Sequence, residues 1–225
     1  MEILKQGNYK IIHLTDGKLI KDAVKIINEG RADGINVNFI ENYLPDINEI
    51  KLAPAIKYIS IRNYGPDFEF DYSAINALSK LEDLSVYTSD RKEINYLNFP
   101  VLTGTALFWR PKAKSLFQCT SLESLFLGKY SEPDLTKLEF LKNLTWLRIN
   151  TGSIKRLNGI EKLQNLTTIF LMEATRLEDL TGIERLPNLR YLMIDCCRNI
   201  KNIQLLTEVS KMVNIKIAGT TPRLR

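Results

Sequence analysis

Histidine is almost absent from this sequence of 225 residues, which contains only His13. One histidine leaves no partner for a histidine-based catalytic triad and excludes a metal site built from several histidines. The phosphate-binding patterns GxxxxGK[ST] and GxGxxG are also missing. We therefore interpret His13 as structural or solvated. We expect no enzyme activity, no bound metal and no cofactor.

Cysteine is scarce and odd in number, with Cys119, Cys196 and Cys197 only. This count argues against a disulfide framework and agrees with a reducing compartment. Cys196 and Cys197 are adjacent, too close together for a CxxC metal knuckle. We expect Cys119 and Cys197 to be buried thiols with a structural role.

Long apolar runs are missing as well. The first residues, MEILKQGNYK, lack the basic start and apolar stretch of a secretory signal, and no segment has the roughly 18 apolar residues of a membrane span. These absences predict a cytoplasmic protein that does not enter a membrane. Two Asn-x-Thr sequences, at Asn143 and Asn165, match the glycosylation pattern, and we interpret both matches as accidental.

Charge of one sign is only slightly in excess. The 31 Lys and Arg residues against 26 Asp and Glu give a net charge of +5, and no long Lys/Arg run concentrates it. This bias could favour an acidic partner, but it does not by itself predict a nucleic-acid-binding surface.

The chain does contain a sustained repeat of apolar residues at every third position. This period fits neither a helix nor an alternating strand, whose periods are 3.6 and 2. It fits a chain that winds once per repeat. Three successive rows show it most clearly: Leu135, Leu138, Leu141, Leu144, Leu147 and Ile149; Ile154, Leu157, Ile160, Leu163, Leu166, Ile169 and Leu171; Leu177, Leu180, Ile183, Leu186, Leu189, Leu192 and Ile194.

Each row ends by changing from steps of three to a step of two, which gives the pattern LxxLxL and predicts a short strand. The first apolar residues of these patterns, here called anchors, are 20 to 25 residues apart, within the usual range of leucine-rich repeats. They predict nine strands. The anchors are Ala32, Ile56, Leu81, Leu102, Leu122, Leu144, Leu166, Leu189 and Met212, and the copy at Leu102 is the weakest.

Phrases such as Leu163-Gln-Asn-Leu166-Thr-Thr-Ile169 and Leu186-Pro-Asn-Leu189-Arg-Tyr-Leu192 resemble bacterial leucine-rich repeat proteins, and are most similar to the internalin-like class with 22-residue repeats. The resemblance implies an α/β repeat fold, a right-handed solenoid with a parallel, concave β-sheet. The family usually places Asn three residues after the last strand leucine. This chain has other residues there, among them Arg110 and Cys197, so the backbone of the turns must be satisfied differently, and we expect an irregular path from each strand to the convex side.

The two ends of the chain depart from the repeat. Residues 1–31 predict an N-terminal cap with a strand at 9–14 and a helix between Lys18 and Glu29. Residues 32–219 form the solenoid, in one domain with the cap. We expect its last unit to close with a helix that places Leu205, Leu206, Val209 and Met212 on one face. Residues 220–225 read as a frayed tail.

The outward residues of the strands, the third, fifth and seventh of each LxxLxL unit, define what we call the concave face. Phe, Trp, Tyr and Met recur on it, with a few arginines, which is the composition of a protein-binding hot spot. Cross-strand packing alone would explain scattered aromatics. The candidate binding residues are Tyr58, Arg62, Tyr87, Phe108, Phe126, Trp146, Arg148, Phe170, Met172, Tyr191, Met193 and Asp195.

The sequence therefore favours a non-enzymatic module, expected to be a monomer, that binds a protein or peptide. Nucleic-acid binding through cations and stacking aromatics is an alternative, but the concave positions hold only Arg62, Arg148 and Lys216 as cations. Resemblance to the family also leaves open a bacterial adaptor or immunity-type protein that neutralises another protein.

Overall fold

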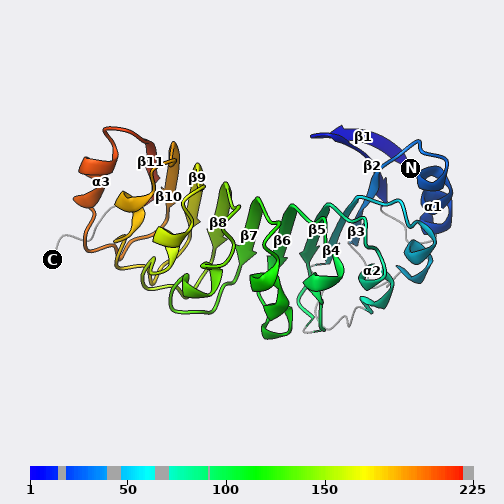
Figure 1. The fold of residues 1–225 in the computed structure, drawn as a ribbon, viewed down its shortest axis with the longest axis horizontal. Coiled ribbons are helices and arrows are strands. Elements are labelled where there is room, and N and C mark those ends of the chain that lie inside the picture. Colours follow the sequence, from blue (N-terminus) through cyan, green and yellow to red (C-terminus); the bar gives the residue numbers. More distant parts are fainter. Residues whose placement is uncertain (15–18, 40–46, 64–70, 91, 220–225) are drawn as a thin grey trace. The chain divides into compact units, whose positions relative to one another are not determined.

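The structure is a computed structural model that describes residues 1–14, 19–39, 47–63, 71–90 and 92–219. The chain divides into two compact units, unit 1 (Met1–Cys119) and unit 2 (Thr120–Arg225). In both units, strands lie side by side on one side and short helices lie on the other (Figure 1). The predicted tail at 220–225 lies outside the described residues.

Unit 1 begins with a hairpin, because β1 pairs with β2 in antiparallel fashion, and continues with parallel strands β2 to β6 in chain order. The elements labelled η are 3₁₀-helices. In order, unit 1 contains β1 (Glu2–Gln6), β2 (Tyr9–Leu14), α1 (Ile20–Asn28), β3 (Gly34–Phe39), η2 (Ile47–Leu52), β4 (Tyr58–Asn63), α2 (Ser73–Asn76), β5 (Asp83–Tyr87), η3 (Tyr96–Asn98), β6 (Gly104–Phe108) and η4 (Pro111–Gln118).

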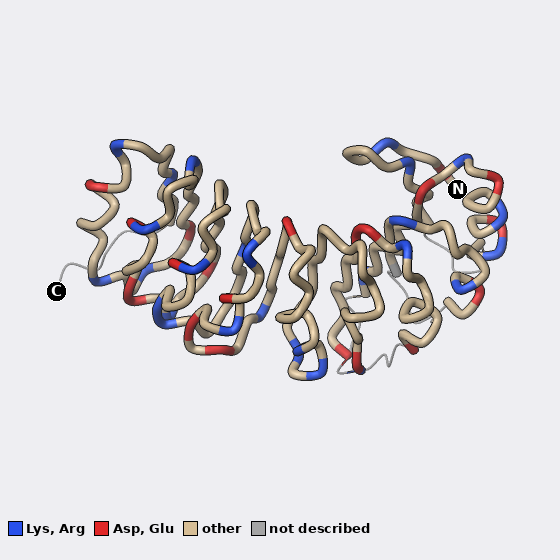
Figure 2. The backbone as a smooth tube through the Cα atoms, viewed as in Figure 1, with Lys and Arg blue, Asp and Glu red and all other residues tan. Residues whose placement is uncertain are grey.

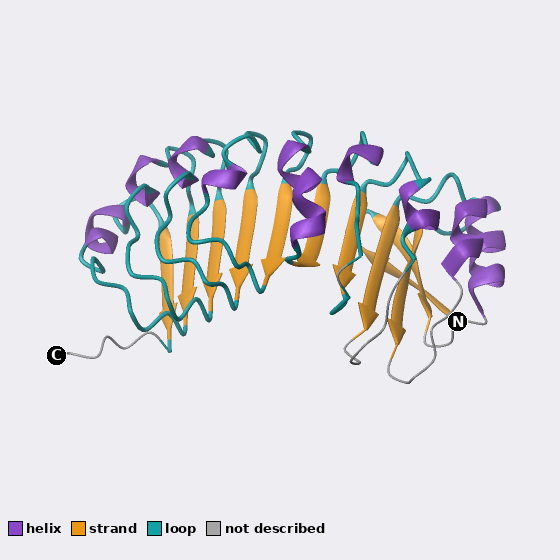
Figure 3. Cartoon of the chain, turned by 90° about the horizontal axis from the view of Figure 1, so that it is seen from below, coloured by secondary structure: helices purple, strands orange, loops and turns teal. Residues whose placement is uncertain are grey.

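Unit 2 repeats the same alternation, with all of its strands parallel and again in chain order. Strand, loop and short helix follow one another in each coil (Figure 3). The elements are β7 (Ser124–Gly128), η5 (Thr136–Leu138), β8 (Trp146–Asn150), η6 (Ile160–Lys162), β9 (Thr168–Met172), η7 (Ile183–Arg185), β10 (Tyr191–Asp195), α3 (Leu205–Val209) and β11 (Asn214–Ala218).

The predicted solenoid is confirmed strand by strand. Each of the nine predicted strands begins two residues after its anchor, as β8 does after Leu144 and β9 after Leu166. The apolar rows form the core, and those between Leu135 and Leu171 are fully buried. In the weakest copy, Thr105 takes a core place, and its hydroxyl donates to the carbonyl of Leu84 at 2.7 Å.

The same pair of backbone bonds joins neighbouring coils where β4, β5, β6, β8, β9 and β10 begin. In unit 2 the amides of Thr145 and Trp146 both donate to the carbonyl of Glu123, at 2.8 and 3.1 Å. The amides of Thr167 and Thr168 bond the carbonyl of Thr145 in the same way, at 2.9 and 3.1 Å. Each coil therefore offers its successor the same acceptor.

The strand and the helix predicted for the N-terminal cap are present, together with one more strand than the sequence indicated. Strand β2 and helix α1 lie where they were predicted, and the left-handed Gly30 (φ 71°) follows the helix. Helix α1 buries Ile20, Ala23, Val24 and Ile27. Strand β1 was not predicted, because its five residues are all exposed and carry no core pattern.

The last unit differs from the prediction at Met212, which is 78% exposed instead of buried. Val213 is buried in its place, at 8% exposure. The amides of Met212 and Val213 both donate to the carbonyl of Val209, so the helical turn continues past α3. Val213 then stands four residues after Val209 and shares its face.

A left-handed residue follows four strands of unit 2 and closes each turn without the family's Asn. These residues are Lys129, Thr151, Glu173 and Cys196, with φ between 50° and 56°. Each donates its amide to the last residue of the next strand, as Lys129 does to Asn150 at 2.8 Å. The turns after these four strands are therefore regular, and the expected irregularity was wrong for this unit.

Two side chains replace the missing Asn as donors to turn backbone. The Cys197 thiol is buried and contacts the carbonyls of Leu171 and Asp195 at 3.5 and 3.4 Å. Burial raises its pKa to about 11, which keeps the thiol protonated and able to donate. Cys119 is buried as well, so the expected burial of both thiols is confirmed.

In unit 1 the corresponding donor is Arg110, which is 3% exposed. Its guanidinium donates to the Thr88 carbonyl at 3.3 Å, to the Thr88 hydroxyl at 2.9 Å and to the Asp90 carboxylate at 2.8 Å. The Tyr72 hydroxyl completes the cluster by donating to Asp90 at 2.7 Å. A buried ion pair thus holds this turn.

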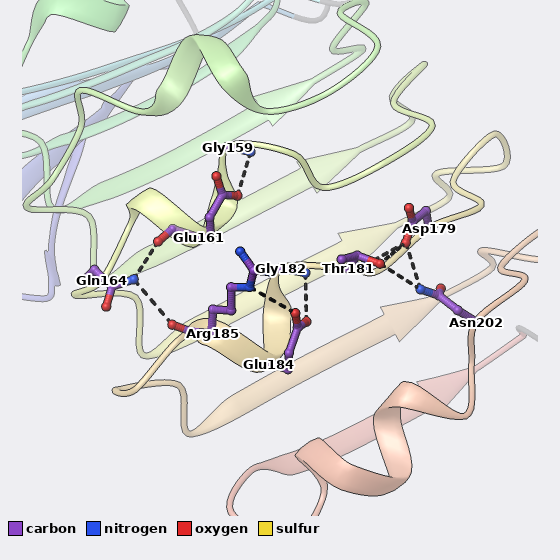
Figure 4. A network of polar contacts seen from close by, with 9 residues as sticks. All are labelled: Gly159, Glu161, Gln164, Asp179, Thr181, Gly182, Glu184, Arg185 and Asn202. Carbon is purple, nitrogen blue, oxygen red and sulfur yellow. Dashed lines mark hydrogen bonds and ion pairs between the residues drawn. The ribbon is translucent and has the colours of Figure 1, made fainter.

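On the helix side of unit 2, two glutamates cap the short helices in the same way (Figure 4). Glu161 accepts from the Gly159 amide at 2.9 Å, and Glu184 accepts from the Gly182 amide at 2.8 Å. Both glycines are left-handed, with φ of 95° and 105°. Carboxylates at this position satisfy an amide that the helix itself leaves unpaired.

The sequences at Asn143 and Asn165 have a structural role in these loops. The Asn143 amide group donates to the carbonyl of Thr120 at 2.9 Å, and that of Asn165 to the carbonyl of Lys142 at 2.9 Å. Both asparagines therefore bond the preceding coil.

Candidate binding surface

In unit 2 the concave face consists of three rows of side chains across β7 to β11, set by the parallel register. The middle row contains four of the eight candidate residues of this unit, and each residue of the row lies beside the next on the neighbouring strand. The middle row is Phe126, Arg148, Phe170, Met193 and Lys216.

Three aromatic rings stack diagonally across β8, β9 and β10. The ring centroids of Trp146 and Phe170 are 5.4 Å apart, and those of Phe170 and Tyr191 are 5.5 Å apart, both pairs tilted by 47°. These separations are typical of favourable aromatic pairs. All three side chains remain partly exposed, so the stack is open to solvent on one side.

Two cations of this face lie close to aromatic rings, one on β8 and one on β11. The guanidinium carbon of Arg148 is 5.3 Å from the ring centroid of Phe126, and the Lys216 ammonium is 5.9 Å from that of Tyr191. Both distances fall within the range of cation–π attraction. The concave face of β7 to β11 therefore combines aromatic rings with positive charge.

The two candidate methionines and the candidate aspartate border the stack. Met193 receives a contact from the Tyr191 hydroxyl, with 3.8 Å between oxygen and sulfur. Met172 and Asp195 are register partners in the third row. All three are partly exposed. Methionine adapts its shape readily, so this border can adjust to a bound surface.

Tyr58 is buried, so the prediction that it is an exposed residue of the concave face was wrong. It is 6% exposed, because the N-terminal hairpin covers it. The Gln6 side chain donates to the Tyr58 hydroxyl at 3.2 Å, and the Tyr9 ring lies 5.6 Å from the Tyr58 ring. The sequence gave no signal for this contact, since β1 carries no repeat pattern.

The remaining candidates of unit 1 form a second cluster of their own. The Arg62 guanidinium lies 5.1 Å from the Tyr87 ring centroid, and the Tyr87 and Phe108 rings meet edge to face at 5.7 Å. All three are partly exposed. Unit 1 therefore repeats the combination of a cation and aromatic rings on three successive strands.

Asp83, on the same face of β5, is a titratable residue that was not chosen as a candidate. Burial raises the pKa of its carboxyl group to about 6, and a hydrogen bond from Ser85 at 3.4 Å opposes this. Its register partners are Tyr58 and Gly104. Nothing in the local sequence indicates this environment, because the burial of Asp83 arises only when the neighbouring strands pair.

The aromatic rings, methionines and cations of this face are side chains of the kinds that contact a bound partner. Within the described ranges, no group of three or more His, Cys, Asp and Glu side chains is placed to hold a metal ion. His13 lies in β2 with Asn36 at 3.5 Å. In the same part of the chain, no helix is long and apolar enough to cross a bilayer.

These features define the class of the fold, which is a leucine-rich repeat solenoid. Among solved structures, the chain is similar to an internalin (inlF) of Listeria monocytogenes, with a TM-score of 0.62 and 18% identity over 93% of this chain and 72% of that chain. It is also similar to internalin C2 of the same organism, with a TM-score of 0.61 and 14% identity over 89% of this chain and 91% of that chain.

A leucine-rich repeat protein of Leptospira interrogans is similar with a TM-score of 0.55 and 19% identity, over 81% of this chain and 52% of that chain. No protein-family model matches the sequence, and no curated protein sequence is significantly similar to it. The likeness to internalins predicted from the repeat is thus confirmed for the fold.

Proposed function

We propose that this chain is a non-enzymatic module that binds a protein or peptide on its concave face. The observation that carries this proposal is the partly exposed stack of Trp146, Phe170 and Tyr191, bordered by Met172 and Met193. Aromatic and methionine side chains are enriched in protein interfaces, and central aromatics contribute much of the binding energy. The leucine-rich repeat fold supports the proposal, because solenoids present extended surfaces of this kind.

The competing explanation is that these rings serve the fold alone. Cross-strand packing of aromatics stabilises sheets by up to about 1 kcal/mol for each pair. Trp146→Ala and Phe170→Ala would then lower the melting temperature and leave binding untouched. Under our proposal the same variants keep the fold, because the core rows beneath them are complete without them.

The experiment compares partner capture and thermal melting on the same variants. We expect Trp146→Ala and Phe170→Ala each to weaken a partner by about 2 kcal/mol, or roughly 30-fold. Phe140→Ala is the matched control, since Phe140 is an aromatic residue with 62% exposure on the helix side of unit 2. Equal retention of partners by all four proteins would end the proposal.

Nucleic-acid binding is the less favoured function. The concave positions of β7 to β11 carry two cations, Arg148 and Lys216, whereas a nucleic acid brings one negative charge with every nucleotide. Any such binding would weaken steeply with added salt. A flat salt response would remove this alternative.

We further propose that the protein works as a monomer in the cytoplasm. Support for the cytoplasm comes from the small and odd number of cysteines, Cys119, Cys196 and Cys197, which does not fit a disulfide framework. Such a composition agrees with a reducing compartment. Light scattering together with fractionation of cells tests both points, and recovery of the native protein from outside the cytoplasm would contradict the second.

A further inference from the structure

We propose that the concave face of unit 2 selects a partner segment that carries a carboxylate next to apolar side chains, and that Arg148 binds this carboxylate. The inference rests on the proposed function, since it specifies the chemistry of the segment that the same face would hold. It begins from Arg148, which has no counterion among the residues that the structure describes.

Arg148 stands in the middle of the face, between Phe126 and Phe170 in the register of β7, β8 and β9. Its guanidinium lies against the Phe126 ring. Its Nε atom is buried and has no hydrogen-bond partner. Among the described residues, no carboxylate lies within ion-pair distance of Arg148.

A guanidinium held against a ring is prepared for one kind of ligand. The ring takes one face of the planar group and restricts its rotation, while the N–H edges keep their donors for other groups. A carboxylate matches two of these donors at once and forms the bidentate pair that arginine favours. Less side-chain freedom is lost on binding, because Phe126 already limits it.

The charges around Arg148 point in the same direction. Lys216 is the second cation of this face, and Asp195 is the single acidic residue at the concave positions of β7 to β11. Asp195 forms an ion pair with neither of them. Elsewhere in both units, Lys and Arg are interspersed with Asp and Glu along the chain (Figure 2). Charge complementarity thus favours an acidic segment at this face.

The neighbours of Arg148 determine what flanks the carboxylate. Trp146 precedes it by two positions on β8, and Phe170 lies beside it on β9. The stack continues through Tyr191. These rings are covered best by aliphatic or aromatic side chains, so the expected segment alternates apolar residues with one Asp or Glu. The backbone of a nucleic acid would bring more negative charge than Arg148 and Lys216 neutralise, and its bases would have to cover the rings.

The probe is a phage-displayed library of short random peptides, selected on the immobilised full chain. We expect the enriched sequences to share one Asp or Glu flanked by Leu, Ile, Phe or Met. A synthetic peptide of that sequence should bind Arg148→Gln at least about 10-fold more weakly than the wild type. Replacing its acid by Asn or Gln should have the same effect, and the two changes together should cost no more than either one.

Two further variants separate the guanidinium from charge in general. Arg148→Lys keeps the charge without the fork, so it should bind with an affinity between those of the wild type and Arg148→Gln. Arg176→Gln is the matched control, because Arg176 is exposed in the loop after β9, away from the concave positions, and should bind as the wild type does. Thermal melting of all variants shows whether each remains folded.

The outcomes distinguish this inference from the proposed function. Peptides without an acid, or peptides that Arg148→Gln binds as well as the wild type, overturn the inference. If Trp146→Ala still weakens them, the proposed function stands. If Trp146→Ala and Phe170→Ala both bind the peptides as well as the wild type does, the inference and the proposed function are both overturned. The inference also fails if no peptide is enriched, or if only a single-stranded oligothymidylate binds through Arg148.

Discussion

Two left-handed glycines, Gly159 and Gly182, precede short helices of unit 2. The cost of placing a side chain at them differs. At Gly159 a Cβ atom would approach backbone atoms of Leu135 and Thr136 to within 2.7 Å. At Gly182 the nearest atom would be a side-chain methyl of Ile160, at 3.1 Å. Backbone cannot move aside as a methyl group can, so Gly159 is the more constrained of the two.

We expect Gly159→Ala to lower the free energy of unfolding by about 3 kcal/mol. Roughly 1–2 kcal/mol comes from the left-handed backbone, and the rest from the clash. Gly182→Ala has the same backbone cost with a softer contact, so it should lose about 1–2 kcal/mol. Urea denaturation of both variants measures the difference, and equal losses would show that the contact with Leu135 and Thr136 is relieved cheaply.

Asp83 makes stability depend on pH at the residue scale. Its pKa of about 6 in the folded protein lies above the ordinary value of 3.8. As pH rises from about 4 to 6, the unfolded chain loses this proton before the folded chain does, so the free energy of unfolding falls. The stability that the protonated Asp83 contributes is complete below its ordinary pKa of 3.8 and is lost above its pKa of about 6 in the folded protein.

Asp83→Asn should therefore be more stable than the wild type at pH 7 and equally stable near pH 4. We expect a gain of about 1 kcal/mol, since solvent reaches part of this site and screens the charge. Denaturation between pH 4 and 7 measures it. Asp22→Asn, which removes an exposed carboxylate of α1, is the matched control for the loss of one carboxyl group.

At the scale of elements, the turn after β6 depends on charge that is removed from water. Arg110 and Asp90 pair at 2.8 Å with side-chain exposures of 3% and 0%. Lys201 and Glu178 form a pair in unit 2 with exposures of 74% and 44%. Buried and exposed pairs differ greatly in what breaking them costs, because an abandoned buried charge cannot regain its hydration.

Arg110→Met should lower the free energy of unfolding by about 3–5 kcal/mol, because Asp90 would remain buried without a counterion. Lys201→Met should change it by less than about 1 kcal/mol. The double variant Arg110→Met with Asp90→Leu should recover part of the loss. Chemical denaturation of the three proteins tests this, and similar losses for Arg110→Met and Lys201→Met would be inconsistent with a buried pair.

The sequence predicts the elements of the solenoid well, because core rows repeat with the coil. It misses what depends on contacts between distant residues. Strand β1 has no apolar row, and therefore its cover over Tyr58 was unforeseen. Met212 fits the spacing of the anchors, but the turn after α3 buries Val213 instead. Outward positions such as Trp146 were identified, whereas the diagonal contact with Phe170 requires the register of β8 and β9.

At the scale of the whole molecule, stability belongs to stacked coils. Conformational entropy of about 1.5 kcal/mol for each ordered residue exceeds what one coil of this length recovers by burying its own aliphatic side chains. The N-terminal cap matters because β2 pairs with β3, and α1 covers apolar residues at that end. Without the cap, an unpaired strand and an apolar surface would face water.

Deleting residues 1–31 should therefore cause aggregation or a cooperative loss of structure. Deleting only residues 1–7 exposes the edge of β2 and removes Gln6 from Tyr58, but it leaves β2 paired with β3 and keeps α1, so this variant should lose less of its melting temperature than the 1–31 deletion. Light scattering and circular dichroism compare them. A monomeric 1–31 deletion with an unchanged melting temperature would refute the role of the cap.

The identical backbone bonds that join successive coils make this architecture extensible. The carbonyl of Thr145 receives the same two amides that the carbonyl of Glu123 receives one coil earlier. A duplicated coil placed between them would find its donors and acceptors already provided. Gene duplication could lengthen such a protein by one coil at a time, and each addition would widen the surface by one strand, so that the reach of the binding face could evolve without redesign of the fold.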